Sequence, residues 1–275
     1  MKRSYVSGLL ALGFAVASFG VGAETYTVTV EPSYPPDQAA EVYQPLLDYI
    51  GKETGHSFTI LATKNYHFYW RDLRQSRPTD FAFEEAHFTD YRMKRSSFVP
   101  LVKKKEDAVF VLVTDPQYAD RGLDGLIGRR IVSMPAPSMG FALAAKMYKN
   151  PVAQPEIRSE ASTWRDGVEM VFSGDAEAAM VPVHIADQYP NLIEIARSDD
   201  YPGAAVSAGP TVPEEVKEAV KAALLKLSDD PAAFEILAEL GASGFEEADP
   251  ALYAGKEQML SVFFGYQPPA PVEGD

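Results

Sequence analysis

Strand-like and helix-like segments alternate along this chain, and the alternation limits the folds open to it. Residues 25–30 alternate polar and apolar side chains at period two, whereas the apolar residues of 42–50 recur at helical spacing. Further strand-like pieces occupy 58–62 and 81–83, and an apolar, β-branched run fills 109–113. This order predicts an α/β fold in which each sheet is mostly parallel and is flanked by helices.

The alternation restarts beyond residue 113, which indicates a second α/β unit. Residues 130–134 and 178–182 have strand patterns, and residues 141–148 and 164–172 have helix patterns. The last third of the chain is mainly helical in pattern.

The first residues resemble an export signal. Lys2 and Arg3 precede an apolar run over 6–21 that leads to small residues ending at Ala23. The run is shorter than the roughly 20 residues that a membrane-spanning helix needs. We therefore expect residues 1–23 to be a cleaved signal peptide and the protein to be periplasmic. The proline-rich residues 267–275 are expected to form a flexible tail.

Composition and missing motifs exclude several classes of protein. The chain has no cysteine, which rules out disulfides and thiolate metal sites. Its 25 Lys and Arg against 39 Asp and Glu give a net charge of −14, which opposes nucleic-acid binding. No nucleophile–base arrangement, phosphate-binding glycine loop or metalloprotease motif occurs, so we expect neither an enzyme nor a cofactor.

Two segments carry candidate binding residues. Glu84, Glu85 and His87 follow a predicted strand, where open α/β sheets bind ligands, and could hold a metal, a hydroxyl or a cation. Acids at a helix N-terminus would explain them equally well. Residues 65–70 hold four aromatic side chains, including Tyr66, together with His67, and these could line a ligand site or pack into a core.

The order of these segments resembles the periplasmic substrate-binding proteins of phosphate, phosphite and phosphonate ABC transporters. The resemblance rests on five segments that span most of the chain: 42–50 (VYQPLLDYI), 73–82 (LRQSRPTDFA), 123–132 (LDGLIGRRIV), 173–179 (SGDAEAA) and the helix pattern over 213–227. It implies a two-lobed Venus-flytrap fold, with lobe 1 formed by 24–113 plus 205–266 and lobe 2 by 114–204. It also implies a monomer that carries a small molecule to a membrane permease.

The resemblance places this chain's binding residues and shows where they depart from the family. The family's Ser-Thr-Ser-Gly turn, which holds the anion, becomes Pro-Ser-Met-Gly at 137–140. Glu84 stands in place of an aromatic residue, Trp164 in place of a histidine, and His184 near the position of an acid. The expected ligand contacts are Tyr34, Tyr66, His67, Glu84, His87, Ser138, Met139, Trp164 and His184.

Fewer anion-binding groups and more apolar ones predict a ligand less polar than phosphonate, namely a hydroxylated apolar molecule such as a sterol or lipid. A phosphonate-type oxyanion, a cation or a metal remain alternatives. So does a sensing role beside a membrane kinase, because the same fold serves transport and sensing.

Overall fold

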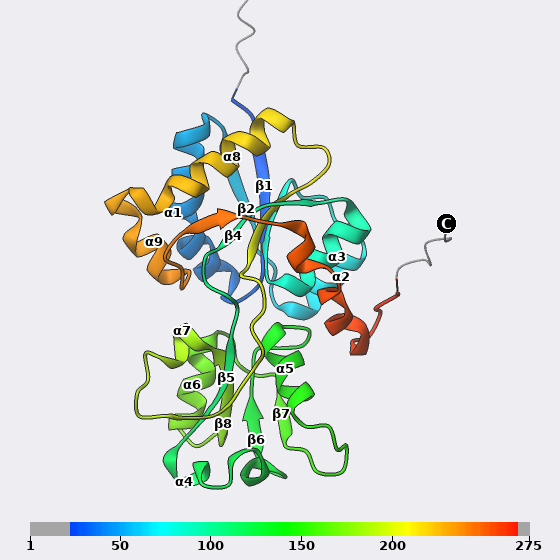
Figure 1. The fold of residues 1–275 in the computed structure, drawn as a ribbon, viewed down its shortest axis with the longest axis vertical. Coiled ribbons are helices and arrows are strands. Elements are labelled where there is room, and N and C mark those ends of the chain that lie inside the picture. The colour runs from blue at the N-terminus through cyan, green and yellow to red at the C-terminus, as the bar shows by residue number, and fades with distance from the viewer. Residues whose placement is uncertain (1–22, 269–275) are drawn as a thin grey trace, which may run out of the picture.

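The computed structural model describes residues 23–268, which form two lobes that are each built on one sheet (Figure 1). Within that range no helix has both the length and the apolar composition to cross a membrane. The expected signal peptide and most of the expected tail lie outside the described residues. The two-lobed α/β architecture that the sequence predicts is confirmed.

The first lobe holds a six-stranded sheet in the order β11-β4-β10-β3-β1-β2. Helices α1, α8 and α9 cover one face, and α2 and α3 cover the other (Figure 1). Its elements are β1 (Thr25–Val30), α1 (Pro36–Thr54), β2 (Ser57–Leu61), α2 (Tyr66–Arg74), β3 (Phe81–Glu84), α3 (Ala86–Ser96), β4 (Val99–Lys104), β10 (Ala205–Ala208), α8 (Glu214–Lys226), η2 (Leu227–Asp229), η3 (Pro231–Ala233), α9 (Phe234–Glu239), β11 (Phe245–Glu247), η4 (Pro250–Tyr253) and η5 (Lys256–Val262).

Local sequence explains where the first helices begin and end. Pro36 opens α1, where a missing N–H costs nothing, and Gly55 closes it at a φ of 75°, a left-handed conformation that glycine adopts without strain. The side chain of Asn65 caps α2 by accepting from the backbone N–H groups of His67 and Phe68. With this cap, α2 begins at Tyr66, which faces the space between the lobes.

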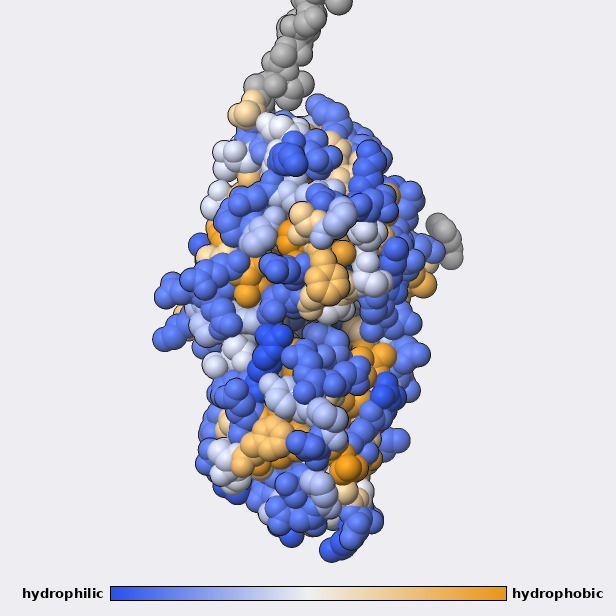
Figure 2. Space-filling view, turned by 90° about the vertical axis from the view of Figure 1, so that its left-hand side faces the viewer, coloured by the Kyte–Doolittle hydropathy of each residue, from blue (hydrophilic) through white to orange (hydrophobic). Residues whose placement is uncertain are grey.

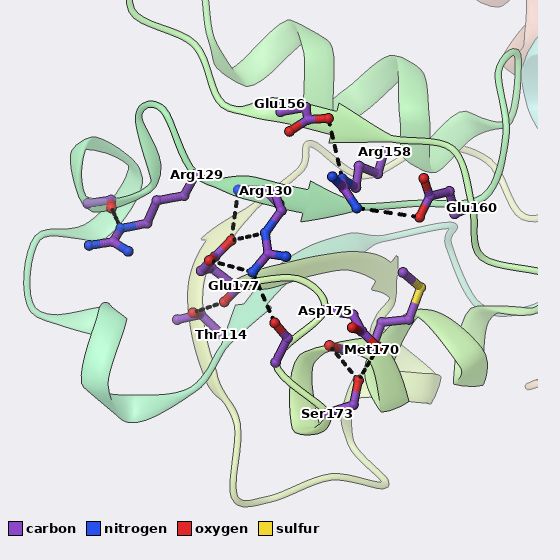
Figure 3. Close-up of polar contacts among 12 residues, drawn as sticks. Thr114, Arg129, Arg130, Glu156, Arg158, Glu160, Met170, Ser173, Asp175 and Glu177 are labelled. Atoms are coloured by element: carbon purple, nitrogen blue, oxygen red, sulfur yellow. Dashed lines mark hydrogen bonds and ion pairs between the residues drawn. The ribbon is translucent and has the colours of Figure 1, made fainter.

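The second lobe holds a five-stranded sheet in the order β7-β6-β8-β5-β9. Its elements are β5 (Phe110–Thr114), α4 (Pro116–Ala119), η1 (Gly122–Leu126), β6 (Arg130–Val132), α5 (Met139–Met147), β7 (Glu156–Arg158), α6 (Trp164–Phe172), β8 (Ala178–Pro182), α7 (Val183–Ala186) and β9 (Ile193–Arg197). Figure 3 shows Arg130, Glu177 and Thr114 converging at one end of three of these strands. Arg130 Nη2 lies 3.0 Å from Glu177 Oε1, and Thr114 Oγ1 donates to the Glu177 carbonyl.

Most strands of each sheet run in the same direction, as predicted, and the exceptions make both sheets mixed. In the first lobe β1 is parallel to β2 and β3, but β10 is antiparallel to β3 and β4, and β11 is antiparallel to β4. In the second lobe β5 is antiparallel to β8 and β9. The chain crosses between the lobes at one end of each sheet, so a strand that enters after a crossover runs opposite to its neighbours.

The first boundary between the lobes lies before residue 110, and not at residue 113 as expected. β5 pairs only with strands of the second sheet, so the outgoing crossover is 105–109 and the return is 198–204. The crossovers touch, since the Ala108 and Tyr201 backbones exchange hydrogen bonds. A Cβ at Gly203 would lie 2.4 Å from the Glu106 carbonyl oxygen, so close backbone packing requires glycine there.

The lobes are closed against each other. One apolar cluster joins Tyr66 and Phe88 of the first lobe with Val132 of the second, and the ring of Phe141 lies 6.0 Å from that of Phe263. Figure 2 shows the lobes in contact on a mostly hydrophilic face.

Candidate functional site

A cavity of about 80 Å³ lies between the lobes. A larger outer cleft, of about 340 Å³, shares Ser33, Tyr34, Trp164 and His184 with it. The cavity is lined by residues of both lobes and of the return crossover: Glu31, Ser33, Tyr34, Tyr43, Tyr66, Phe83, Glu84, Glu85, Lys104, Met139, Trp164, Pro182, His184, Ala204, Glu239 and Leu240.

Three carboxylates come from the ends of two neighbouring strands. β1 and β3 are parallel with Val30 opposite Phe83, so the residues that follow, Glu31 and Glu84–Glu85, emerge at the same edge of the sheet. Glu31 Oε1 accepts from the Glu85 backbone N–H at 2.5 Å, and Glu31 Oε2 accepts from the Tyr66 hydroxyl at 2.9 Å. The Glu31 carboxyl therefore occupies the N-terminus of α3.

Burial shifts the proton affinities of Glu31 and Glu85. Burial raises the pKa of Glu31 well above its usual range, and the neighbouring Glu85 raises it further. Burial also raises the pKa of Glu85, which Lys104 partly offsets. Within residues 23–268, the solvent-shielded Oε2 of Glu85 has no hydrogen-bond partner. Both shifts favour the protonated carboxyl over the carboxylate at this position.

Glu84 is already neutralised by its own lobe. Arg92 Nε donates to both carboxylate oxygens at 2.8 Å, and the Tyr69 hydroxyl donates to Oε1. The side chains of Glu84 and Arg92 are 0% and 6% exposed. Glu84 thus lines the cavity as half of a buried ion pair, and not as a free charge.

A second set of charged side chains lies at the cavity where the two lobes meet. Arg165 of the second lobe lies 3.0 Å from Glu239 of the first, and the Tyr34 hydroxyl donates to the same oxygen at 2.6 Å. Despite burial, these hydrogen bonds lower the pKa of Glu239. Lys104 Nζ donates to the Leu240 carbonyl at 2.8 Å. Burial lowers the pKa of Lys104, and burial with nearby cations lowers that of His184 to about 4.

Aromatic rings form the remaining walls. Tyr34 and Tyr43 lie 6.3 Å apart at 77°, and Tyr43 and Phe83 lie 6.3 Å apart at 88°, so neighbouring rings meet as corners. From the second lobe, Trp164 packs edge-on to Phe110 at 5.4 Å. Aromatic rings therefore line the cavity together with the carboxylates.

The N-terminus of α5 offers few groups to an anion. Ser138 Oγ donates to the Met134 carbonyl at 2.9 Å and accepts from the Phe141 N–H at 3.2 Å, so the hydroxyl is a helix cap. A Cβ on Gly140 would lie 2.8 Å from the Trp164 ring, so this ring covers the start of the helix.

The structure brings together six of the nine expected contacts: Tyr34, Tyr66, Glu84, Met139, Trp164 and His184. The other three lie elsewhere. His67 is on the exposed side of α2 because helical spacing turns it away from Tyr66. Ser138 is buried as the α5 cap. His87 is buried with its Nε2 3.1 Å from the Pro137 carbonyl, so it joins the lobes instead.

Sequence reasoning missed Glu31, Tyr43, Lys104 and Glu239 as lining residues. Glu31 follows its strand as Glu84 follows the neighbouring strand, and this signal could have identified it. Nothing local marks Tyr43 or Glu239, because helix packing places them. Among residues 23–268, no three His, Asp or Glu side chains are grouped so as to hold a metal ion.

Comparison with known proteins gives one family. The family model described as ABC transporter, phosphonate, periplasmic substrate-binding protein matches residues 28–253. No curated protein was found to match the sequence.

Solved structures share the fold at low identity. PhnD1 from Prochlorococcus marinus in complex with methylphosphonate has a TM-score of 0.72 at 14% identity, over 86% of this chain and 97% of that one. A binding protein component of an ABC phosphonate transporter from Pseudomonas aeruginosa has a TM-score of 0.68 at 14% identity, over 86% and 85%. A Xanthomonas citri protein bound to ATP has a TM-score of 0.65 at 15% identity, over 86% and 98%.

Proposed function

The chain belongs to the family of periplasmic substrate-binding proteins of ABC phosphonate transporters, and from that premise we propose that it captures a small molecule in the interlobe cavity and delivers it to a membrane permease. Members of this family bind solutes and are not enzymes. One observation carries the proposal: residues of both lobes line one cavity, beside which the Arg165–Glu239 pair joins the lobes at 3.0 Å. Lobe closure and ligand capture would therefore be linked. The signal peptide over 1–23 and the monomeric state belong to the same proposal.

The cavity's contacts argue against a phosphonate-like dianion. At the start of α3 the carboxyl of Glu31 already accepts from the Glu85 N–H, and the α5 capping hydroxyl is already paired. A dianion would also lie beside the Glu31–Glu85 pair. Lys104 is a lining cation that could oppose this, but burial lowers its pKa.

Size and polarity also argue against the sterol or lipid expected from the sequence. One water molecule needs about 10–15 Å³ by this measure, so a ligand of four fused rings would extend from the cavity of about 80 Å³ into the adjoining cleft of about 340 Å³. Four carboxylates on the walls would be costly to cover with hydrocarbon. We therefore propose a ligand that is smaller and more polar than a sterol and is not a dianion.

Tryptophan fluorescence tests the proposal, because the chain has two tryptophans and only Trp164 lines the cavity. Trp70 is buried in the first lobe, with its Nε1 donating to the Phe264 carbonyl. We expect a small polar solute to change the emission of wild-type protein but not that of Trp164→Phe. Saturable binding of methylphosphonate, or of cholesterol, with the Trp164 signal would contradict the ligand proposed here. Failure of every small solute to bind, with none retained by native mass spectrometry, would contradict solute capture itself.

A further inference from the structure

The charges around the cavity do not balance. Two of its carboxylates have dedicated partners, since Glu84 is held by Arg92 at 2.8 Å and Glu239 by Arg165 at 3.0 Å. These pairs are neutral toward the cavity. The charge of the site is therefore decided by the groups that remain.

The remaining groups carry at least one excess negative charge when they are ionised. Glu31 and Glu85 face Lys104, which also lies near Glu106 outside the cavity. From the second lobe, His184 also lines the cavity. It adds no positive charge at neutral pH because its pKa is lowered to about 4. Two carboxylates against one ammonium leave one negative charge, and a buried charge without a partner is costly. Protonation of Glu31 relieves it, and a bound monocation would relieve it equally well.

The unpaired oxygen shows where such a cation would sit. Glu85 Oε2 is shielded from solvent and, in the part of the chain that the structure describes, receives no hydrogen bond. It is an unsatisfied acceptor on a residue that lines the cavity, and a ligand N–H group would satisfy it. The walls beside it are the rings of Tyr34, Tyr43, Tyr66 and Phe83.

Those rings supply the second half of the recognition. Aromatic faces attract cations through their quadrupole, most strongly where water is excluded. Tyr34 and Tyr43 meet at an interplanar angle of 77°, and Tyr43 and Phe83 meet at 88°, so the three lining rings differ in orientation. Aromatic rings and carboxylates that line one cavity are the groups that recognise an ammonium compound.

We propose that the ligand is a small organic monocation, a primary to quaternary ammonium compound, whose positive centre lies between Glu31, Glu85 and these rings. The proposal rests on the proposed function, because it names the solute class for the same cavity. It also has a thermodynamic consequence. Burial and Glu85 raise the pKa of Glu31, and a bound cation would favour its ionised form, so binding should release protons and strengthen as pH rises, the opposite of what anion binding beside these acids would show.

Isothermal titration calorimetry on the full mature chain tests the proposal. The probes are ammonium, methylammonium, tetramethylammonium, ethanolamine and choline, with methylphosphonate as the anionic arm. Two buffers of different ionisation enthalpy report the protons released. We expect at least one ammonium compound to bind and methylphosphonate not to bind. Glu85→Gln, which keeps the shape and removes the charge, should weaken that ammonium compound about tenfold or more.

Two further variants make the result specific. Glu31→Gln should abolish proton release and flatten the pH dependence of affinity. Glu247→Gln removes the same charge from an exposed residue of β11, whose side chain is 70% exposed, and should leave affinity unchanged. Binding of an ammonium compound that survives Glu85→Gln within threefold would overturn the assignment of the site.

The outcomes separate this inference from the proposed function. Methylphosphonate binding without any response to ammonium compounds would overturn the proposal of a cationic ligand but would leave solute capture intact. So does a co-purified ligand of neutral or negative charge in native mass spectra. Absence of any bound solute, from the panel or from the host, overturns both.

Discussion

Replacing Arg92 with Met should strongly destabilise the first lobe. The Arg92 guanidinium donates to both oxygens of Glu84 at 2.8 Å, and the two side chains are 6% and 0% exposed. Without Arg92 the carboxylate keeps the Tyr69 hydroxyl but loses its counter-charge. Breaking a buried pair on one side costs about 3–5 kcal/mol. In a chain of this size each kcal/mol lowers Tm by about 2–4 °C, so Tm should fall by about 6–20 °C.

The double variant Arg92→Met/Glu84→Gln decides the cause. Removing both charges leaves no stranded ion, so most of the lost stability should return. Arg71→Met is the matched control, because Arg71 pairs with Asp72 at the surface, where its side chain is 47% exposed, and should cost less than about 1 kcal/mol. Thermal unfolding followed by circular dichroism measures all three. If Arg92→Met melts within about 2 °C of wild type, or the double variant is no more stable than the single one, the reasoning is refuted.

Three further changes probe the closed state. Arg165→Gln removes the interlobe pair with Glu239, and since both side chains are about one-third exposed, at 36% and 34%, we expect ligand affinity to fall about two- to fivefold. Small-angle scattering should show a larger ligand-free radius of gyration, and an unchanged radius and affinity would show that the pair does not hold the lobes. Burial lowers the pKa of His87 from 6.5 to about 4, so the unfolded chain binds one more proton between these values. Unfolding free energy should therefore fall by about 3 kcal/mol as pH drops from 6.5 to 4, and His87→Gln should remove that part of the slope in urea titrations. A variant slope equal to that of wild type would assign the effect to other groups. Gly140→Ala would place a Cβ 2.8 Å from the Trp164 ring, so we expect a loss of about 1–3 kcal/mol and a shifted tryptophan emission. Unaltered tryptophan emission and stability would show that the Trp164 ring can move away from the added methyl group at no measurable cost.

Local patterns predicted many elements well. The helix over 164–172 and the strand over 178–182 occur with the predicted bounds. Their signals are contained in the segments themselves, as apolar spacing and, for the helix, as the Thr163 cap that accepts from the Asp166 N–H. Strand direction was not predictable in this way. Whether β10 runs with or against β3 depends on where the chain crosses between the lobes, and a strand's own pattern is the same either way.

For the candidate site residues too, the sequence indicates the residue type and local position, and tertiary contacts decide whether the side chain lines the cavity. Tyr66, Met139 and Trp164 line the cavity, and each is the first residue of its helix. Ser138 and His87 sit at similar positions, but hydrogen bonds to the Met134 and Pro137 carbonyls hold them within the protein. A side chain's type shows which bonds it can form, and only its neighbours in space show which of them are already made.

The sequence by itself determined the two α/β units and an acidic chain whose anion-binding turn is altered, because these are properties of residue type and spacing. Only the tertiary structure decided what that acidity does in the cleft. Arg92 lies eight residues beyond Glu84 and still neutralises it, whereas Glu31 and Glu85 meet at the ends of two neighbouring strands, where burial raises the pKa of both. Counting charges along the chain gives their sum, but the free energy of each depends on which counter-charge lies within a few ångströms and how little water lies between.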